Sequence, residues 1–160
     1  MRIAEIAVIA PRAEEGKKFI AAICSQLEVA SEHLVVGRSI INDQLVLHLY
    51  GLAIPPESKN LSWDLLDRKL LGYIVLFSWN DEASLESIKR SLDQITARPE
   101  AVLVVAANVS AAEPPALQAL GDKSLFVNQQ GKFIFYKEDE AGSAKQVLLT
   151  LIDLLIERAE

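Results

Sequence analysis

The stretch IAEIAVIAPRAEEGKKFI, residues 3–20, changes its hydrophobic period within a few residues and thereby decides the fold class. Residues 3–9 are apolar and mostly β-branched apart from Glu5, which predicts a buried strand that stops before Pro11. From about Glu15 the apolar residues follow one helical stripe, made of Phe19, Ile20, Ile23 and Leu27. A strand that feeds a helix through a short turn is the building unit of α/β proteins.

The rest of the chain repeats this alternation of strands and helices. Further strands are predicted at 34–41, 44–50, 73–78, 101–107 and 132–136. Further helices are predicted at 62–72, around Leu85, Ile88, Leu92 and Ile95, at 114–121, and from about Gly142 to the end. Residues 124–127 leave two alternatives open, a second hairpin with 132–136 or a loop that leads into a last strand.

The turn-favouring pair Asn42-Asp43 separates 34–41 from 44–50 and predicts an antiparallel hairpin. The other strands alternate with helices, which predicts parallel pairing with helices on both faces of the sheet. We therefore expect one domain over residues 1–160, a three-layer α/β fold. Its sheet is mainly parallel, with about six strands, and strand 34–41 is the antiparallel edge.

Composition excludes several classes of function. The 160 residues carry a net charge of −6 without a long basic stretch, which argues against binding to nucleic acid. One cysteine and two histidines make neither an internal disulfide nor a zinc site. The apolar runs are shorter than a transmembrane helix, and the first residues do not resemble a secretory signal, so we expect a cytoplasmic protein.

The remaining chemistry-bearing residues are interpreted as structural. His33 and His48 are far apart in sequence, and His48 is expected to be a sheet histidine rather than a base. Cys24 is expected to pack as a small apolar residue. Trp79, and Phe126 with Phe133 and Phe135, suit a core role better than a partner surface.

Three segments resemble a known family. GRSIINDQLVLHLYG (37–51), SWDLLDRKLLGYIVLFSW (62–79) and VLVVAAN (102–108) are similar to the matching stretches of bacterial small GTPases of the gliding-motility Mgl type and their ATP/GTP-binding relatives. The resemblance covers nearly the whole chain and implies a Ras-like P-loop NTPase fold. It rests mostly on scaffold segments, which indicate fold more than function.

The nucleotide motifs that this resemblance implies are degenerate. The phosphate loop reads APRAEEGKKF (10–19), and two registers are open: Gly16 replaces the lysine, or Gly16-Lys17 is kept and Lys18 replaces the Mg²⁺ ligand. After the third strand only Gly51 remains of the γ-phosphate sensor. The base-selecting Asn-Lys-x-Asp has become Asn108-Val-Ser-Ala.

The resemblance therefore implies a pseudo-GTPase, a non-catalytic protein-interaction or scaffold module in bacterial regulation, with no catalytic residue, metal or cofactor. Gly16, Lys17, Lys18, Gly51 and Asn108 would form a vestigial nucleotide site. The expected partner is a roadblock/longin-type protein that uses the edge strand 34–41, and a homodimer is left open. The alternative is a divergent GTP/ATP-binding protein that holds GTP or GDP weakly, with weak or no hydrolysis. The sequence offers no set of acid, base and nucleophile that would support a small-molecule enzyme.

Overall fold

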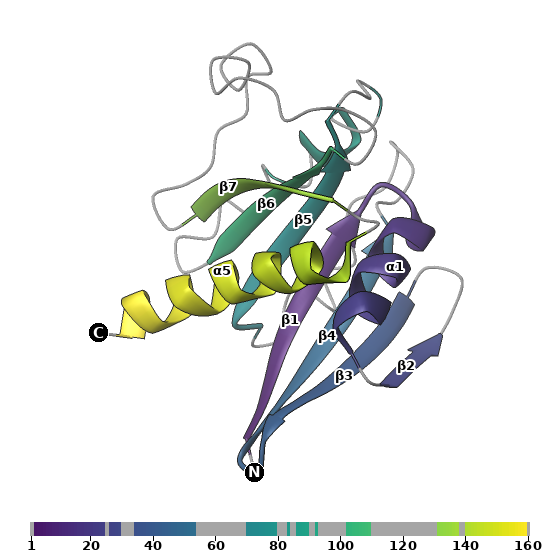
Figure 1. Cartoon of the computed structure of the whole chain (residues 1–160). Helices are drawn as coiled ribbons and strands as arrows, with labels where there is room; N and C mark the ends of the chain where they lie inside the picture. Colours follow the sequence, from purple (N-terminus) through teal and green to yellow (C-terminus); the bar gives the residue numbers. More distant parts are fainter. Residues whose placement is uncertain are drawn as a thin grey trace.

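The computed structural model is an α/β protein, and its described residues form a seven-stranded sheet (Figure 1). It describes residues 2–24, 26–29, 34–53, 70–79, 83, 86–89, 92, 102–109, 131–137 and 140–159. The elements are β1 Arg2–Ala10, α1 Ala13–Ile23, β2 Gln26–Val29, β3 Leu34–Asn42, β4 Leu45–Ala53, β5 Gly72–Ser78, β6 Leu103–Asn108, β7 Gly131–Tyr136 and α5 Ala141–Ala159. Across the sheet the strands lie in the order β2-β3-β4-β1-β5-β6-β7.

The sheet is mainly parallel, as the alternation of strands and helices predicts. Strands β4, β1, β5, β6 and β7 pair in parallel, and only β3 runs antiparallel to both of its neighbours. The β3–β4 hairpin turns where Asn42-Asp43 predicts it. There the Asn42 Oδ1 accepts a hydrogen bond from the Gln44 N–H at 2.7 Å, a local contact that holds the turn.

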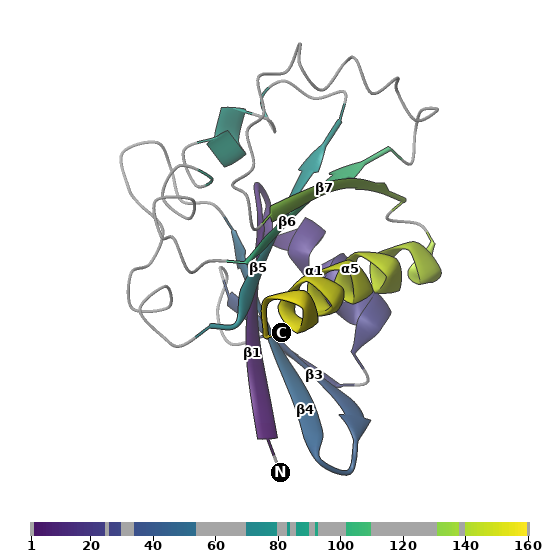
Figure 2. The same ribbon diagram turned by 90° about the vertical axis from the view of Figure 1, so that its left-hand side faces the viewer.

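Helices α1 and α5 lie together on one face of the sheet (Figure 2). The continuous apolar runs of β5 and β6 are buried on both faces, as expected for central parallel strands. The core on the helical face includes Ile6, Val8, Phe19, Ile20, Leu49, Val147 and Leu151. The core on the opposite face includes Ile9, Val75, Phe77, Trp79 and Val105, against which the helical residues Ile88 and Leu92 pack.

Trp79 belongs to this second core, which confirms the structural interpretation of its side chain. It is only 4% exposed, and its ring centroid lies 5.0 Å from that of Phe135 and 6.0 Å from that of Phe133. The rings meet edge to face, the arrangement that aromatic quadrupoles favour. Phe133 and Phe135 lie on β7, which pairs in parallel with β6, so 132–136 is a parallel strand of the sheet.

Helix α1 approaches the sheet closely because the strands beneath it carry glycines. A Cβ atom on Gly37 of β3 would collide with Ile20 and come within 2.9 Å of the Cys24 Sγ. A Cβ atom on Gly51 of β4 would come within 2.8 Å of the Ile20 Cδ1. These two glycines therefore set how deeply Ile20 sits in the core.

The prediction that Leu27 belongs to the first helix is wrong. The helix starts at Ala13 and ends at Ile23, where Cys24 becomes extended and its N–H donates to the Ile20 carbonyl at 2.8 Å. The chain then enters β2, where Leu27 is 37% exposed. The spacing of Leu27 fits a helix only by coincidence, because a four-residue strand is too short to show its own period.

The prediction that strand 34–41 forms the edge is also wrong, although the antiparallel pairing does lie at this side of the sheet. Strand β2 adds a seventh strand outside β3 and pairs its four residues with Val35, Val36, Gly37 and Arg38. The backbone of β3 is thus bonded on both sides over this stretch, and the edge strand is β2.

The remaining predictions fall partly on the described residues. Leu70, placed at the end of a 62–72 helix, is not helical and packs against the second core instead. Residues 62–69, Leu85, Ile95, 114–121 and 124–127, with His33 and Phe126, lie outside the described residues. Within the described part of the chain, no helix has the length and apolarity needed to span a membrane.

The close approach of α1 leads to a stability prediction. Replacing Gly37 with Ala should lower the free energy of unfolding by about 1–3 kcal/mol, because the added methyl group overlaps Ile20 in a closed core. Gly142→Ala is the matched control, since a Cβ there meets nothing within 4 Å and the position is helical. Urea unfolding followed by circular dichroism measures both variants, and equal stabilities would contradict the packing described.

Candidate functional site

The junction between β1 and α1 consists of only two residues, Pro11 and Arg12. Arg12 is extended and caps the helix without a side-chain hydrogen bond, while its carbonyl accepts from the Glu15 N–H at 3.2 Å. A phosphate-binding loop needs a longer glycine-rich stretch here, so that successive N–H groups can surround the phosphates. In this chain most of the 10–19 segment is already helical.

Gly16, Lys17 and Lys18 all lie within α1. Gly16 is buried, and a Cβ there would stand 3.9 Å from the Cα of Gly51, so these two predicted site residues are neighbours. Their contact packs the helix against β4. Lys17 and Lys18 are exposed on the outer side of α1. In this structure Gly16 is thus a buried residue of the helix over β4, while Lys17 and Lys18 are exposed.

Asn108 lies in a different part of the sheet. It is the last residue of β6, and its carbonyl accepts a hydrogen bond from the Trp79 N–H at 3.1 Å, which joins the ends of β5 and β6. Strands β1 and β5 separate it from β4. The residue of β6 that lies level with Gly51 is Val104, and Asn108 follows four residues later. Strand spacing and rise then put Asn108 roughly 20 Å from Gly51.

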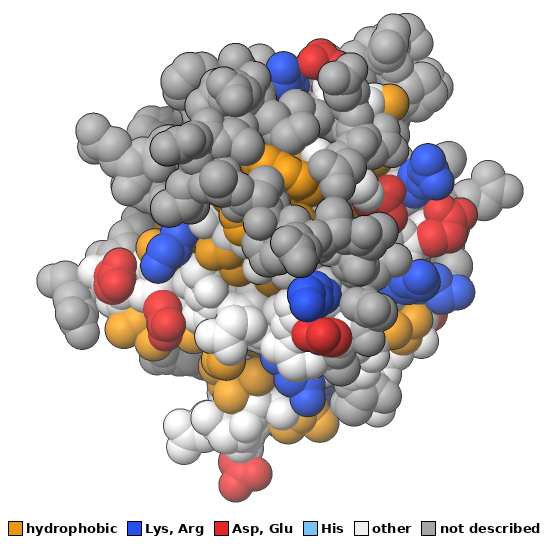
Figure 3. Space-filling model, turned by 45° about the horizontal axis from the view of Figure 1, so that its top comes forward, with side chains coloured by type: hydrophobic (Ala, Val, Ile, Leu, Met, Phe, Trp, Pro, Cys, Tyr) orange, Lys and Arg blue, Asp and Glu red, His pale blue; other side chains and the backbone are white. Residues whose placement is uncertain are grey.

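The start of α1 is unsuited to a phosphate group. Its first turn carries Glu14, which is exposed, and Glu15, which is half-buried. Carboxylates favour this end of a helix because they complement its dipole, and they would repel an anion that approached the same N–H groups. Figure 3 turns this end of the sheet forward and shows the described acidic and basic side chains interspersed, without a broad patch of one sign.

A second candidate site, made of polar side chains, lies on the sheet face opposite α1 and α5. Register pairing aligns Gln26 of β2, Arg38 of β3, His48 of β4 and Glu5 of β1 in one row across four neighbouring strands. Directly paired residues of a sheet point to the same face, so these polar side chains are neighbours. The positions next to them on β1, Ala4 and Ile6, belong to the core under the helices.

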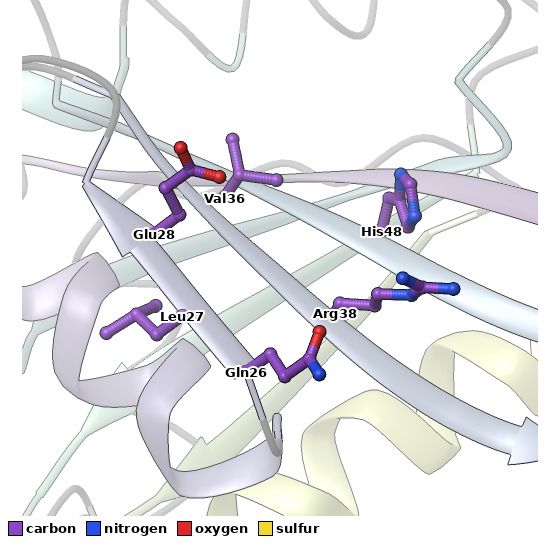
Figure 4. A pocket seen from close by; sticks show the side chains of 6 residues that line it. All are labelled: Gln26, Leu27, Glu28, Val36, Arg38 and His48. Carbon is purple, nitrogen blue, oxygen red and sulfur yellow. The ribbon is translucent and has the colours of Figure 1, made fainter.

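A depression of about 390 Å³ opens over this row (Figure 4). It is lined by Gln26, Leu27, Glu28, Val36, Arg38 and His48. In Figure 4 the side chains of Glu28, Val36, Arg38 and His48 lie on one side of the strands, while Leu27 extends from the other side toward α1. The His48 and Tyr50 rings meet edge to face at 6.5 Å.

The side chains of this depression offer groups for hydrogen bonds and ion pairs. Arg38 offers a planar guanidinium for a carboxylate, and Glu28 and Gln26 supply acceptors beside it. The described lining contains no hydroxyl or thiol that could act as a nucleophile. His48 was recognised from the sequence as a sheet histidine, but Gln26, Glu28 and Arg38 were missed. Their only signal is alternation along β2 and β3, which does not reveal which strands are neighbours.

Cys24 lies on the helical side of the sheet, beside Gly37. Burial in this apolar contact raises the pKa of its thiol from 9.0 to about 11, so the group is protonated at neutral pH. A protonated thiol is a poor nucleophile, in line with the packing role expected for this residue.

Comparison with known proteins does not assign the chain to a family. No protein-family model matches the sequence, and no curated protein matches it.

The helical position of Gly16 can be tested by substitution. Gly16→Ala should raise the free energy of unfolding by about 0.5–1 kcal/mol, because alanine costs less backbone entropy in a helix and its methyl group fits at ordinary contact distance. Thermal unfolding of the variant and the parent protein measures the difference. A loss of stability would show that Gly16 needs a conformation other than the helical one.

The raised pKa of Cys24 predicts that its thiol reacts slowly with alkylating reagents. Below pH 9 the folded protein should react with iodoacetamide at least tenfold more slowly than the urea-unfolded chain, because its thiolate fraction is smaller. The rate should keep rising with pH until about 11. Since the unfolded chain loses this proton first, the free energy of unfolding should fall as the pH rises from 9 toward 11. A rate that levels off near pH 9 in the folded protein would contradict the burial of the thiol.

Proposed function

We propose that this protein is a non-catalytic protein-interaction module, a Ras-like α/β domain of the bacterial cytoplasm that has lost its phosphate loop. It acts as a scaffold or constitutive partner and does not switch with GTP. The resemblance to Mgl-type small GTPases suggests this class. The order of a strand, a turn, a helix, a hairpin and further parallel strands is compatible with it.

One observation carries the proposal: only two residues, Pro11 and Arg12, separate β1 from α1. A triphosphate needs several backbone N–H groups and a lysine that converge on it at this junction. Here Gly16 is packed against Gly51, and Lys17 and Lys18 lie on the exposed side of α1. To rebuild the loop, the chain would have to unwind the first turns of α1 and lose the contacts that hold the helix on the sheet.

The polar sheet face is the proposed contact surface for a protein partner. Because β2 covers β3, the partner would dock over the Arg38–His48 row and not by pairing with strand 34–41. The open depression combines a cation, an imidazole, an amide and the carboxylate of Glu28, which suits the polar rim of a protein interface. The resemblance suggests a roadblock/longin-type protein as this partner.

A nucleotide titration tests the loss of the switch. Purified protein is titrated calorimetrically with GDP, GTP and ATP, with and without Mg²⁺, up to millimolar nucleotide. We expect no saturable heat. Saturable binding that depends on Mg²⁺ would contradict the proposal and favour the divergent GTP/ATP-binding protein.

A charge reversal tests the partner surface. Arg38→Glu should weaken binding to a roadblock/longin-type protein of the same cell by about tenfold or more, because it replaces the main cation of the depression. Lys132→Glu makes the same charge change at an exposed position of β7 and should leave the affinity unchanged. Equal effects of the two variants would place the contact elsewhere, and a wild-type protein that binds no such partner would contradict the partner class.

A further inference from the structure

Helix α5 has more apolar surface than its contact with the sheet requires. Its core face is formed by Ala144, Val147, Leu148 and Leu151, all of which are buried. Leu149 and Ile156 do not belong to this face, and their side chains are 50% and 53% exposed. Figure 2 shows α5 as the outer layer on its side of the sheet. Such side chains indicate a partner surface where they form a continuous stripe with further apolar residues.

The two exposed residues belong to a seam along α5. Leu149, Ile152 and Ile156 follow one another at intervals of three and four residues, and Ile152, which packs against the core at the border of the seam, is half-buried between the two exposed side chains. Lys145 lies one turn before Leu149 on the same stripe. Intervals of three and four residues line up side chains for packing against a second helix, as in a coiled coil.

The charges near this stripe indicate which partner fits it and in which orientation. Lys145 lies at its amino end, and the exposed Asp153 and Glu157 lie beside its carboxyl end, on the neighbouring side of the helix. If a second α5 packs antiparallel, Leu149 of each copy meets Ile152 of the other, and each Lys145 reaches Ile156 and Glu157 of the other. Parallel packing would set lysine against lysine and glutamate against glutamate. The stripe is therefore complementary in charge to itself when one copy is reversed.

We propose that the α5 seam of Lys145, Leu149, Ile152 and Ile156 is a homodimer interface, occupied by α5 of a second copy in antiparallel orientation. The arrangement is isologous, as a twofold-symmetric dimer requires. The inference does not rest on the proposed function, because the Arg38–His48 row lies on the opposite face of the sheet.

Sedimentation equilibrium of the full chain at micromolar concentration tests the interface. We expect the wild type to be a dimer, and Leu149→Glu and Ile156→Glu each to weaken it by about tenfold or more, because a carboxylate replaces a side chain buried in the seam. Ile40→Glu is the matched control, since Ile40 is 61% exposed on β3, away from α5, and its variant should dimerise like the wild type. A monomeric wild type, or a control as dissociated as Leu149→Glu, would overturn the proposal.

Charge reversals at exposed positions test the interface without changing the core of the protein. Lys145→Glu and Glu157→Lys should each weaken the dimer, because each creates like charges across an antiparallel seam. The double variant Lys145→Glu with Glu157→Lys should recover the wild-type association, since it only exchanges the two partners. Failure of the double variant to recover association would overturn the antiparallel arrangement.

A cross-linking experiment reads the direction of the helices directly. In a Cys24→Ser background, Lys145→Cys and Glu157→Cys proteins are treated with a short bis-maleimide, separately and mixed. We expect cross-linked dimers chiefly in the mixture, because residue 145 of one copy lies beside residue 157 of the other. Efficient cross-linking of each variant with itself would show a parallel pair and overturn the proposal.

Discussion

The close packing of α1 against glycines in β3 and β4 is the constraint on which the arrangement of this molecule depends. Ile20 occupies space that any side chain at Gly37 would fill, and Gly16 of the helix faces Gly51 of the strand. The same helix begins after a junction of only two residues, and its first turn carries the carboxylates of Glu14 and Glu15.

The same packing determines the path of the chain after the carboxyl end of α1. The helix ends at Ile23, and Cys24 is extended beside Gly37, so the chain is directed to the outside of β3. There the short strand β2 completes the sheet and covers the backbone that the hairpin would otherwise expose. One face of β3 and β4 thus supports α1, and the opposite face presents the row of polar side chains around Arg38 and His48.

How far the sequence predicts this structure depends on how local each signal is. The hairpin was predictable because Asn42 and Asp43 form its turn within a few residues, and β5 and β6 were predictable because a doubly buried strand is apolar throughout. Strand β2 was missed because four residues with a helix-compatible leucine give no independent period. The polar row could not be predicted, since Gln26, Arg38 and His48 become neighbours only through strand register, which alternation does not specify.

Hydrogen exchange of the Lys17, Lys18 and Phe19 amides, followed by NMR with and without millimolar Mg²⁺ and GTP, tests the central claim that α1 replaces the phosphate loop. We expect slow exchange at all three amides without nucleotide, because each donates within the helix, and no change when nucleotide is added. Fast exchange that becomes slow on addition of Mg²⁺ and GTP would contradict it, since the segment would then be a loop that folds around phosphate.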